Sequence, residues 1–188
     1  KNIIDSAESK ILEISNRKKT ADFTPINEIV LDSFKSIEAL MGNKNGLTGL
    51  PTGFEDLDNL TSGLHGSDFI ILAARPSMGK TTFAMNLVES VLFNNNLPAL
   101  VYSMEMPADS IAMRLISSFG RVHQGHLRAG KMDADEWSKV TSTIVHLQEK
   151  NLYIDDSSAL PPTELRSRAR RIAKMHGGKL GCIMVDYL

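Results

Sequence analysis

The chain of 188 residues has a formal net charge of −1, with 42% hydrophobic and 23% charged residues, which is typical of a globular protein with one domain of ordinary size and at most a short appendage. This charge excludes nucleic-acid binding that is driven by a basic chain as a whole, and the longest apolar run, Phe69 to Ala74, is too short to span a bilayer. The single cysteine, Cys182, excludes an intrachain disulfide and favours a reducing, cytoplasmic location.

Two helices are predicted at the amino-terminal end of the chain. The first covers residues 2–16 and has a narrow apolar stripe, formed by Ile4, Ala7, Ile11 and Ile14. A helix this short is unstable alone in water, so we expect its stripe to dock on another surface. The second helix begins at Pro25, after the N-cap residue Thr24, and ends near Met41.

Strands and helices alternate from Asp68 onward, after a short helical turn at 54–60. Strands are predicted at 69–74, 98–103, 152–155 and 181–185, and helices at 80–94, 107–119, 134–149 and 163–175. The third of these helices begins with a capping box, formed by Asp133 and Glu136. The alternation predicts an α/β domain in which helices flank a mostly parallel sheet and a nucleotide lies at the carboxyl ends of the strands.

The segment Ala74–Thr81 has the form of a phosphate-binding loop between a buried strand and a helix. In such a loop, the lysine (here Lys80) contacts the β- and γ-phosphates and the hydroxyl of Thr81 contacts Mg²⁺. Ala74 stands where the usual pattern has glycine, and alanine accepts the turn if φ is negative. The loop predicts a site for ATP or a close relative, with the nucleotide held by Ser77, Met78, Gly79, Lys80, Thr81 and Thr82.

Two acidic residues follow apolar strands and are candidates for the hydrolytic chemistry, which needs a metal-side carboxylate and a base that orients water. Asp186 ends the last strand and is the candidate for the metal side; alternatively, it caps the next turn. Glu105 follows the strand at 98–103 and is the candidate base; alternatively, it only helps the next helix to begin. We therefore predict catalytic roles for Glu105 and Lys80, and a metal site formed by Thr81 and Asp186.

The densest positive charge lies on the helix at 163–175, where Arg166, Arg170 and Lys174 recur at helical spacing. A solvated face beside Glu164 is the favoured interpretation, and contact with DNA or a subunit is the alternative. The five histidines show no ligand spacing with a cysteine, so we assign no metal site to them.

Several segments form a specific set. They are Ala-Ala-Arg-Pro-Ser-Met-Gly-Lys-Thr-Thr-Phe-Ala-Met-Asn (73–86), Ser-Met-Glu-Met-Pro (103–107), Ile-Asp-Asp-Ser-Ser (154–158), Arg-Ser-Arg-Ala-Arg-Arg (166–171), Met-Val-Asp-Tyr-Leu (184–188), and the segments 48–58 and 7–14. Over essentially the whole chain they resemble the bacterial replicative DNA helicases of the DnaB family. Arg-Pro-Ser-Met in the phosphate loop separates this family from generic ATPases, and Ala74 belongs to the family's own pattern.

The resemblance implies a RecA-like P-loop NTPase fold, a hexameric ring around single-stranded DNA, and ATP-driven 5′-to-3′ movement that unwinds duplex at the replication fork. It implies that Glu105 is the water-activating base, that Asp186 is the metal-side acid, and that the first helix docks on a neighbouring subunit. We assign residues 1–17 to this linker helix and residues 18–188 to the ATPase domain. ATP and Mg²⁺ are the expected cofactors, and primase and a helicase loader are expected partners of the whole protein. No membrane partner is expected.

The resemblance also implies that parts of the family's motor are missing from this chain. We expect a fragment that lacks the primase-binding domain before the linker and the DNA-binding loops and arginine finger after Asp186, so that its sheet is truncated. Such a fragment is expected to bind ATP weakly, hydrolyse little and unwind nothing. Two other interpretations remain: another RecA-like DNA-dependent ATPase of recombination or repair, and a non-catalytic fragment that only docks subunits through its first helix.

Overall fold

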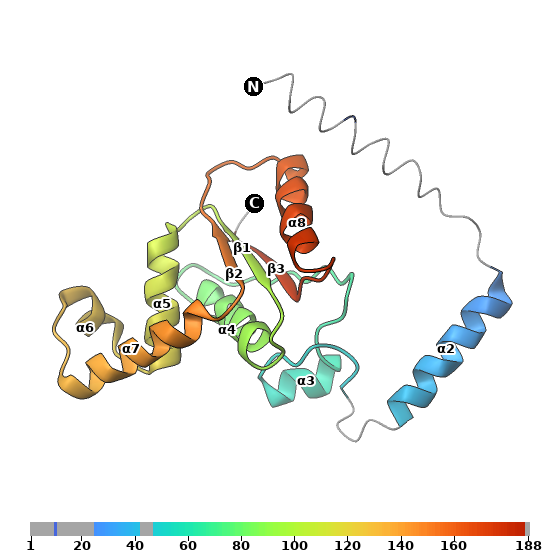
Figure 1. Ribbon diagram of the computed structural model, residues 1–188, viewed down its shortest axis with the longest axis horizontal. Helices are drawn as coiled ribbons and strands as arrows, with labels where there is room; N and C mark the ends of the chain where they lie inside the picture. The colour runs from blue at the N-terminus through green and yellow to red at the C-terminus, as the bar shows by residue number, and fades with distance from the viewer. Residues whose placement is uncertain (1–9, 11–24, 42–46, 187–188) are drawn as a thin grey trace. The chain divides into compact units, whose positions relative to one another are not determined.

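The computed structural model describes Lys10, residues 25–41 and residues 47–186 (Figure 1). The chain divides into two compact units, residues 1–45 and 46–188. In the first unit, α2 (Ile26–Met41) begins one residue after Pro25, where the start was predicted, and it ends at Met41 as predicted. The helix predicted at 2–16 lies outside the described residues except for Lys10, which is helical. Among the described residues, no helix is both long and apolar enough to cross a bilayer.

A parallel three-stranded sheet organises the second unit. β1 (Ala99–Ser103) lies between β2 (Leu152–Asp155) and β3 (Cys182–Asp186), and it pairs with both in parallel. The helices of this unit are α3 (Glu55–Thr61), α4 (Lys80–Phe93), α5 (Ala108–Gly120), α6 (Gln124–Ala129), α7 (Ala134–Gln148) and α8 (Pro162–Met175). Since parallel strands all end at the same edge, the residues that follow β1 and β3 come together there.

Helices cover both faces of the sheet, as Figure 1 shows. α4 and α5 pack on one face, where Ala99 and Val101 of β1 contribute to their shared core. α8 packs on the other face, against Leu100 and Tyr102 of the same strand. This alternation follows from the two-residue period of a strand, and burial on both faces explains why β1 is an apolar run. The predicted α/β architecture is therefore confirmed.

Local sequence determines how α7 and α6 begin. In α7, the Asp133 carboxylate accepts a hydrogen bond from the Glu136 N–H (2.7 Å), and both halves of the predicted capping box are present. The short helix α6 was not predicted. The His123 ring nitrogen Nδ1 accepts from the Gly125 N–H (3.1 Å) at its start, and Gly130 ends it with a φ of 65°. A helix of six residues is too short to show a 3.6-residue period in the sequence.

The strand predicted at 69–74 is wrong in this structure. These residues form neither strand nor helix, and Phe69 and Ile71 are 85% and 77% exposed. A strand needs a neighbour that takes up its backbone hydrogen bonds. In the described part of the chain, β3 is an edge strand that pairs only with β1, and no strand lies between it and the apolar run. The apolar composition identified a strand-like segment but could not supply its partner.

Candidate functional site

The loop before α4 contains two residues with a left-handed backbone conformation. Ser77 and Gly79 have positive φ angles of 64° and 85°, and the Met78 N–H donates to the Arg75 carbonyl (3.2 Å). A Cβ added to Gly79 would meet nothing within 4 Å. Glycine therefore suits this position because of its left-handed backbone, and not because of close packing. Gly79 is also the N-cap of α4, so the first N–H groups of the helix begin at this turn.

Asp186 binds the two polar side chains that begin α4. Its Oδ1 lies 2.8 Å from the Lys80 ammonium, and its Oδ2 accepts a hydrogen bond of 2.6 Å from the Thr81 hydroxyl. Asp186 is buried at the end of β3, and it is 105 residues from Thr81 in the sequence. The fold thus brings together three of the residues that the sequence assigned to phosphate and metal binding.

Glu105 lies at the same edge of the sheet. The register of β1 and β3 places Ser103 opposite Asp186, and the Met104 N–H donates to the Asp186 carbonyl (2.8 Å). Glu105 is the next residue and is exposed. An exposed carboxylate beside the end of β3 is accessible to a ligand on the loop, so its position fits the predicted base.

The donor set at this edge suits a hard divalent cation such as Mg²⁺. Magnesium is usually held by one or two protein oxygens, with water and substrate phosphates completing its shell. The Thr81 hydroxyl and the Asp186 carboxylate are two such oxygens in contact with each other. In the described residues, no group of three or more His, Cys, Asp and Glu side chains could hold a metal by itself. A bound phosphate would therefore have to complete the shell of any ion held here.

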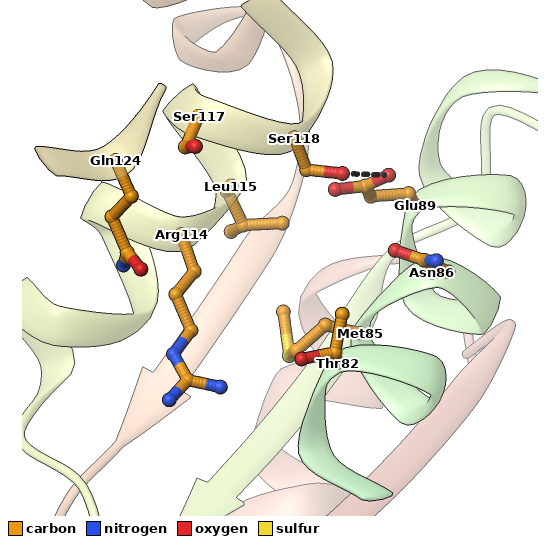
Figure 2. Close-up of a pocket in the computed structure, with 9 residues that line it drawn as sticks. All are labelled: Thr82, Met85, Asn86, Glu89, Arg114, Leu115, Ser117, Ser118 and Gln124. Carbon is orange, nitrogen blue, oxygen red and sulfur yellow. Dashed lines mark hydrogen bonds between the residues drawn. The ribbon is translucent and has the colours of Figure 1, made fainter. Parts of the chain in front are cut away.

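A cavity of about 390 Å³ lies between α4, α5 and α6, and the sequence analysis missed it (Figure 2). Thr82, which follows Thr81 in the phosphate loop, is one of the lining residues. Glu89 of α4, Arg114 of α5 and Gln124 of α6 supply polar groups. No spacing rule connects side chains on three helices. A partial signal existed, because Thr82 and Glu89 are seven residues apart and so share one face of α4.

Burial affects the titration of Glu89 and of Cys182. Desolvation raises the pKa of the Glu89 carboxyl, and a hydrogen bond from the Ser118 hydroxyl opposes this effect. Desolvation also raises the pKa of the Cys182 thiol to about 11. Cys182 is therefore protonated at neutral pH and is a poor nucleophile or metal ligand.

The basic residues of α8 have two kinds of environment. Arg168 binds Asp155 at 2.5 Å and also binds Glu164, so it attaches the helix to the end of β2. Desolvation acts to raise the pKa of Asp155, but hydrogen bonds from Ser157 and Arg168 outweigh it, so that the pKa is lowered. Arg166 and Lys174 are exposed. Part of the basic charge is thus structural, and the solvated-face interpretation fits the rest.

Comparisons with known proteins agree with this geometry. The family described as DnaB-like helicase C terminal domain matches residues 49–188. A protein named replicative DNA helicase DnaB from Pasteurella multocida is 50% identical over all of this chain and 41% of its own length. A protein of the same name from Geobacillus stearothermophilus is 38% identical over 99% of this chain and 40% of its own length. The chain thus spans about two fifths of these relatives.

Solved structures extend the likeness to the fold. One solved ATPase domain superimposes with a TM-score of 0.81 at 30% identity, over 89% of this chain and 58% of the other. A DnaB-like replicative helicase, studied with its primase interactions, gives a TM-score of 0.83 at 30% identity, over 98% of this chain and 42% of the other. The predicted RecA-like core is therefore confirmed. The sheet, the loop before α4 and the sequence matches lead to one conclusion: the chain belongs to the DnaB-like helicase C terminal domain family.

Proposed function

We propose that this chain is part of the motor of an ATP-dependent replicative DNA helicase. The observation that carries the proposal is the contact of one buried carboxylate, Asp186, with both Lys80 and Thr81. These are the cation that would meet the phosphates and the hydroxyl that would meet the metal. Membership of the helicase family supports the choice of DNA unwinding over other uses of such a site.

The residues of the loop have separate tasks in the proposed site. The N–H groups from Ser77 to Thr82 hold phosphate oxygens, helped by the positive end of α4. Lys80 moves its ammonium from Asp186 to the β- and γ-phosphates of ATP. Thr81 and Asp186 are the residues that would hold Mg²⁺, and such an ion would neutralise phosphate charge. Catalysis at this site is therefore mostly positioning and electrostatic stabilisation.

Glu105 is the proposed general base. It orients the attacking water and accepts its proton, while Lys80 stabilises the charge that develops on the γ-phosphate. Its exposure and its place one residue after the β1–β3 hydrogen bond support this role. Because its neighbour Met104 is tied to the end of β3, the backbone that carries Glu105 is fixed close to Asp186.

The partners of the whole protein follow from the family. We propose a homohexamer around single-stranded DNA that moves 5′ to 3′ in the cytoplasm, with an amino-terminal linker helix at residues 1–17 docked on a neighbouring subunit. Primase and a helicase loader are proposed partners of the full-length protein. A primase interaction is named for one structural relative.

The test is nucleotide binding and hydrolysis in matched variants. We expect Lys80→Ala to abolish ATP binding in isothermal titration calorimetry, because the loop loses the ammonium that meets the phosphates. Lys139→Ala, which changes an exposed lysine of α7, is the control and should bind like the parent chain.

In a full-length protein that carries this chain, Glu105→Gln should still bind ATP but lose DNA-stimulated hydrolysis by roughly a hundredfold or more. Unchanged hydrolysis in Glu105→Gln would remove the base from the proposal.

A further inference from the structure

A buried serine ends the central strand of the sheet. Ser103 is the last residue of β1 and is only 2% exposed. A buried hydroxyl is unfavourable unless it forms hydrogen bonds. The Ser103 Oγ donates to the Met106 carbonyl (2.7 Å) and accepts from the Met106 N–H (3.2 Å). The serine side chain therefore closes a bend over residues 104–106, and Glu105 is the middle residue of that bend.

A second side chain holds the far end of the same segment. The chain passes from the bend through Pro107 into α5, where the Ala108 N–H donates to Oδ2 of Asp156 (2.9 Å). Asp156 directly follows β2, which pairs with β1. The first N–H groups of a helix have no partner within the helix, so a carboxylate at this position ties the helix to the neighbouring strand. Ser103 and Asp156 thus hold the two ends of one short segment.

The residues on either side of Glu105 attach the bend to the core. Met104 packs against the cluster on the α8 face of the sheet, and Met106 packs against the cluster on the α4 and α5 face. Both methionines are half-buried, whereas Glu105 is exposed. The Met104 N–H also donates to the Asp186 carbonyl. The bend therefore presents an exposed carboxylate on a backbone that is fixed to the sheet.

These attachments matter for hydrolysis because a general base must be held close to one geometry. A displacement of about 1 Å can lower a rate by roughly a hundredfold. Resting on the proposed role of Glu105 as the base, we propose that Ser103 and Asp156 are positioning residues of the hydrolytic site. They act through the backbone that carries Glu105, so that its carboxylate meets the attacking water.

The experiment measures DNA-stimulated ATP hydrolysis in a full-length protein that carries this chain. We expect Ser103→Ala to lower kcat by about tenfold with little change in KM, because the base is displaced while the phosphate loop is untouched. Ser103→Thr keeps the hydroxyl and should retain more of the parent kcat than Ser103→Ala. Asp156→Ala, at an exposed position, should lower kcat by about threefold, again with KM unchanged.

The matched control is Ser117→Ala. The Ser117 hydroxyl donates to the Val122 carbonyl over the same distance, 2.7 Å, at the opposite end of α5 from Ala108. This variant should lose about as much stability in urea unfolding as Ser103→Ala, yet keep the parent kcat. A drop of kcat in Ser117→Ala equal to that in Ser103→Ala would show general destabilisation and would overturn the positioning role.

A double variant tests whether Ser103 acts through Glu105. Ser103→Ala should lower kcat no further in a protein that already carries Glu105→Gln. Losses that multiply would overturn the proposal, and so would the parent kcat in both Ser103→Ala and Asp156→Ala. If Ser103→Ala does not fold, Asp156→Ala alone and combined with Glu105→Gln decides by the same criteria. Full hydrolysis by Glu105→Gln would instead refute the proposed base, and this inference with it.

Discussion

Asp186 holds Lys80 and Thr81 in contacts that a nucleotide at the proposed site would have to replace. Its two oxygens bind one partner each, at 2.8 Å and 2.6 Å. In the proposed site, phosphates would compete for Lys80, and a metal ion would compete for Asp186 and Thr81. Because the carboxylate is buried, its attraction for Lys80 is weakly screened by solvent. The described structure therefore has a self-paired site, and binding exchanges one set of charge contacts for another.

This exchange predicts opposite effects of Asp186→Asn with and without magnesium. Without Mg²⁺, the variant should bind ADP several-fold more tightly than the parent, because Lys80 no longer leaves a carboxylate to reach the phosphates. With Mg²⁺, it should bind ADP more weakly, because a metal oxygen is lost. Calorimetry at both conditions checks the sign of each change. Asp56→Asn, at an exposed position in α3, is the control. The same direction of change in both conditions would contradict the self-paired site.

At the scale of the elements, the packing of β3 against α4 holds the residues of the site in place. Gly181 directly precedes β3, and a Cβ added there would lie 2.3 Å from Cγ1 of Val91 in α4 and 2.8 Å from Cβ of Leu97. Val91 is fully buried, so it has little room to move. Close packing at this glycine lets the start of β3 approach the end of α4, and the same two elements hold Asp186 beside Lys80.

We expect Gly181→Ala to destabilise the fold by about 1–3 kcal/mol through overpacking. The matched control is Gly66→Ala, because a Cβ at Gly66 meets nothing within 4 Å and its φ is not in the left-handed region. That change should be neutral or slightly stabilising, since alanine restricts the unfolded chain. Urea unfolding of the two variants and the parent measures both effects. Equal stability of the two variants would show that the contact with Val91 relaxes easily.

Sequence patterns were sufficient for the elements whose partners lie within the described chain. The strands β1, β2 and β3 were predicted from local sequence alone, and the structure supplies each of them with a parallel partner. α7 was predicted with its capping box, because that signal needs only Asp133 and Glu136. The run at 69–74 had the same apolar composition but forms no strand, because pairing depends on a neighbour that local composition cannot reveal.

The functional residues likewise include some that the sequence predicted and some that it did not. Lys80, Thr81 and Asp186 were predicted because a loop motif and an acid at a strand end have recognisable forms, and parallel pairing brings them together. The polar cavity was missed, because Glu89, Arg114 and Gln124 lie on three helices and meet only after those helices pack. A contiguous motif can be predicted from chemistry, whereas a constellation across elements depends on packing angles that the sequence does not state.

At the scale of the whole molecule, α2 has an apolar face without a core of its own. Ile26, Ile29, Val30 and Ile37 recur at helical spacing and are about half exposed or more. The polypeptide divides after Asn45, so this helix belongs to a different unit from the sheet. An isolated amphipathic helix of 16 residues is marginal in water. If the whole protein is a homohexamer, as proposed, burial of this face on another copy would stabilise both the helix and the assembly.

This argument predicts that a charge within the apolar stripe disrupts assembly without affecting the proposed nucleotide site. Ile37→Asp should shift the chain to a lower mass in size-exclusion chromatography with light scattering, measured over a range of protein concentrations, because a buried carboxylate without a partner is strongly unfavourable. Leu31→Asp is the control, because Leu31 is also apolar and 61% exposed but lies off the stripe, and it should leave the mass unchanged. Tripolyphosphate binding should be equal in both variants, since the phosphate loop lies in the other unit. An assembly that survives Ile37→Asp would place the subunit contact elsewhere on the chain.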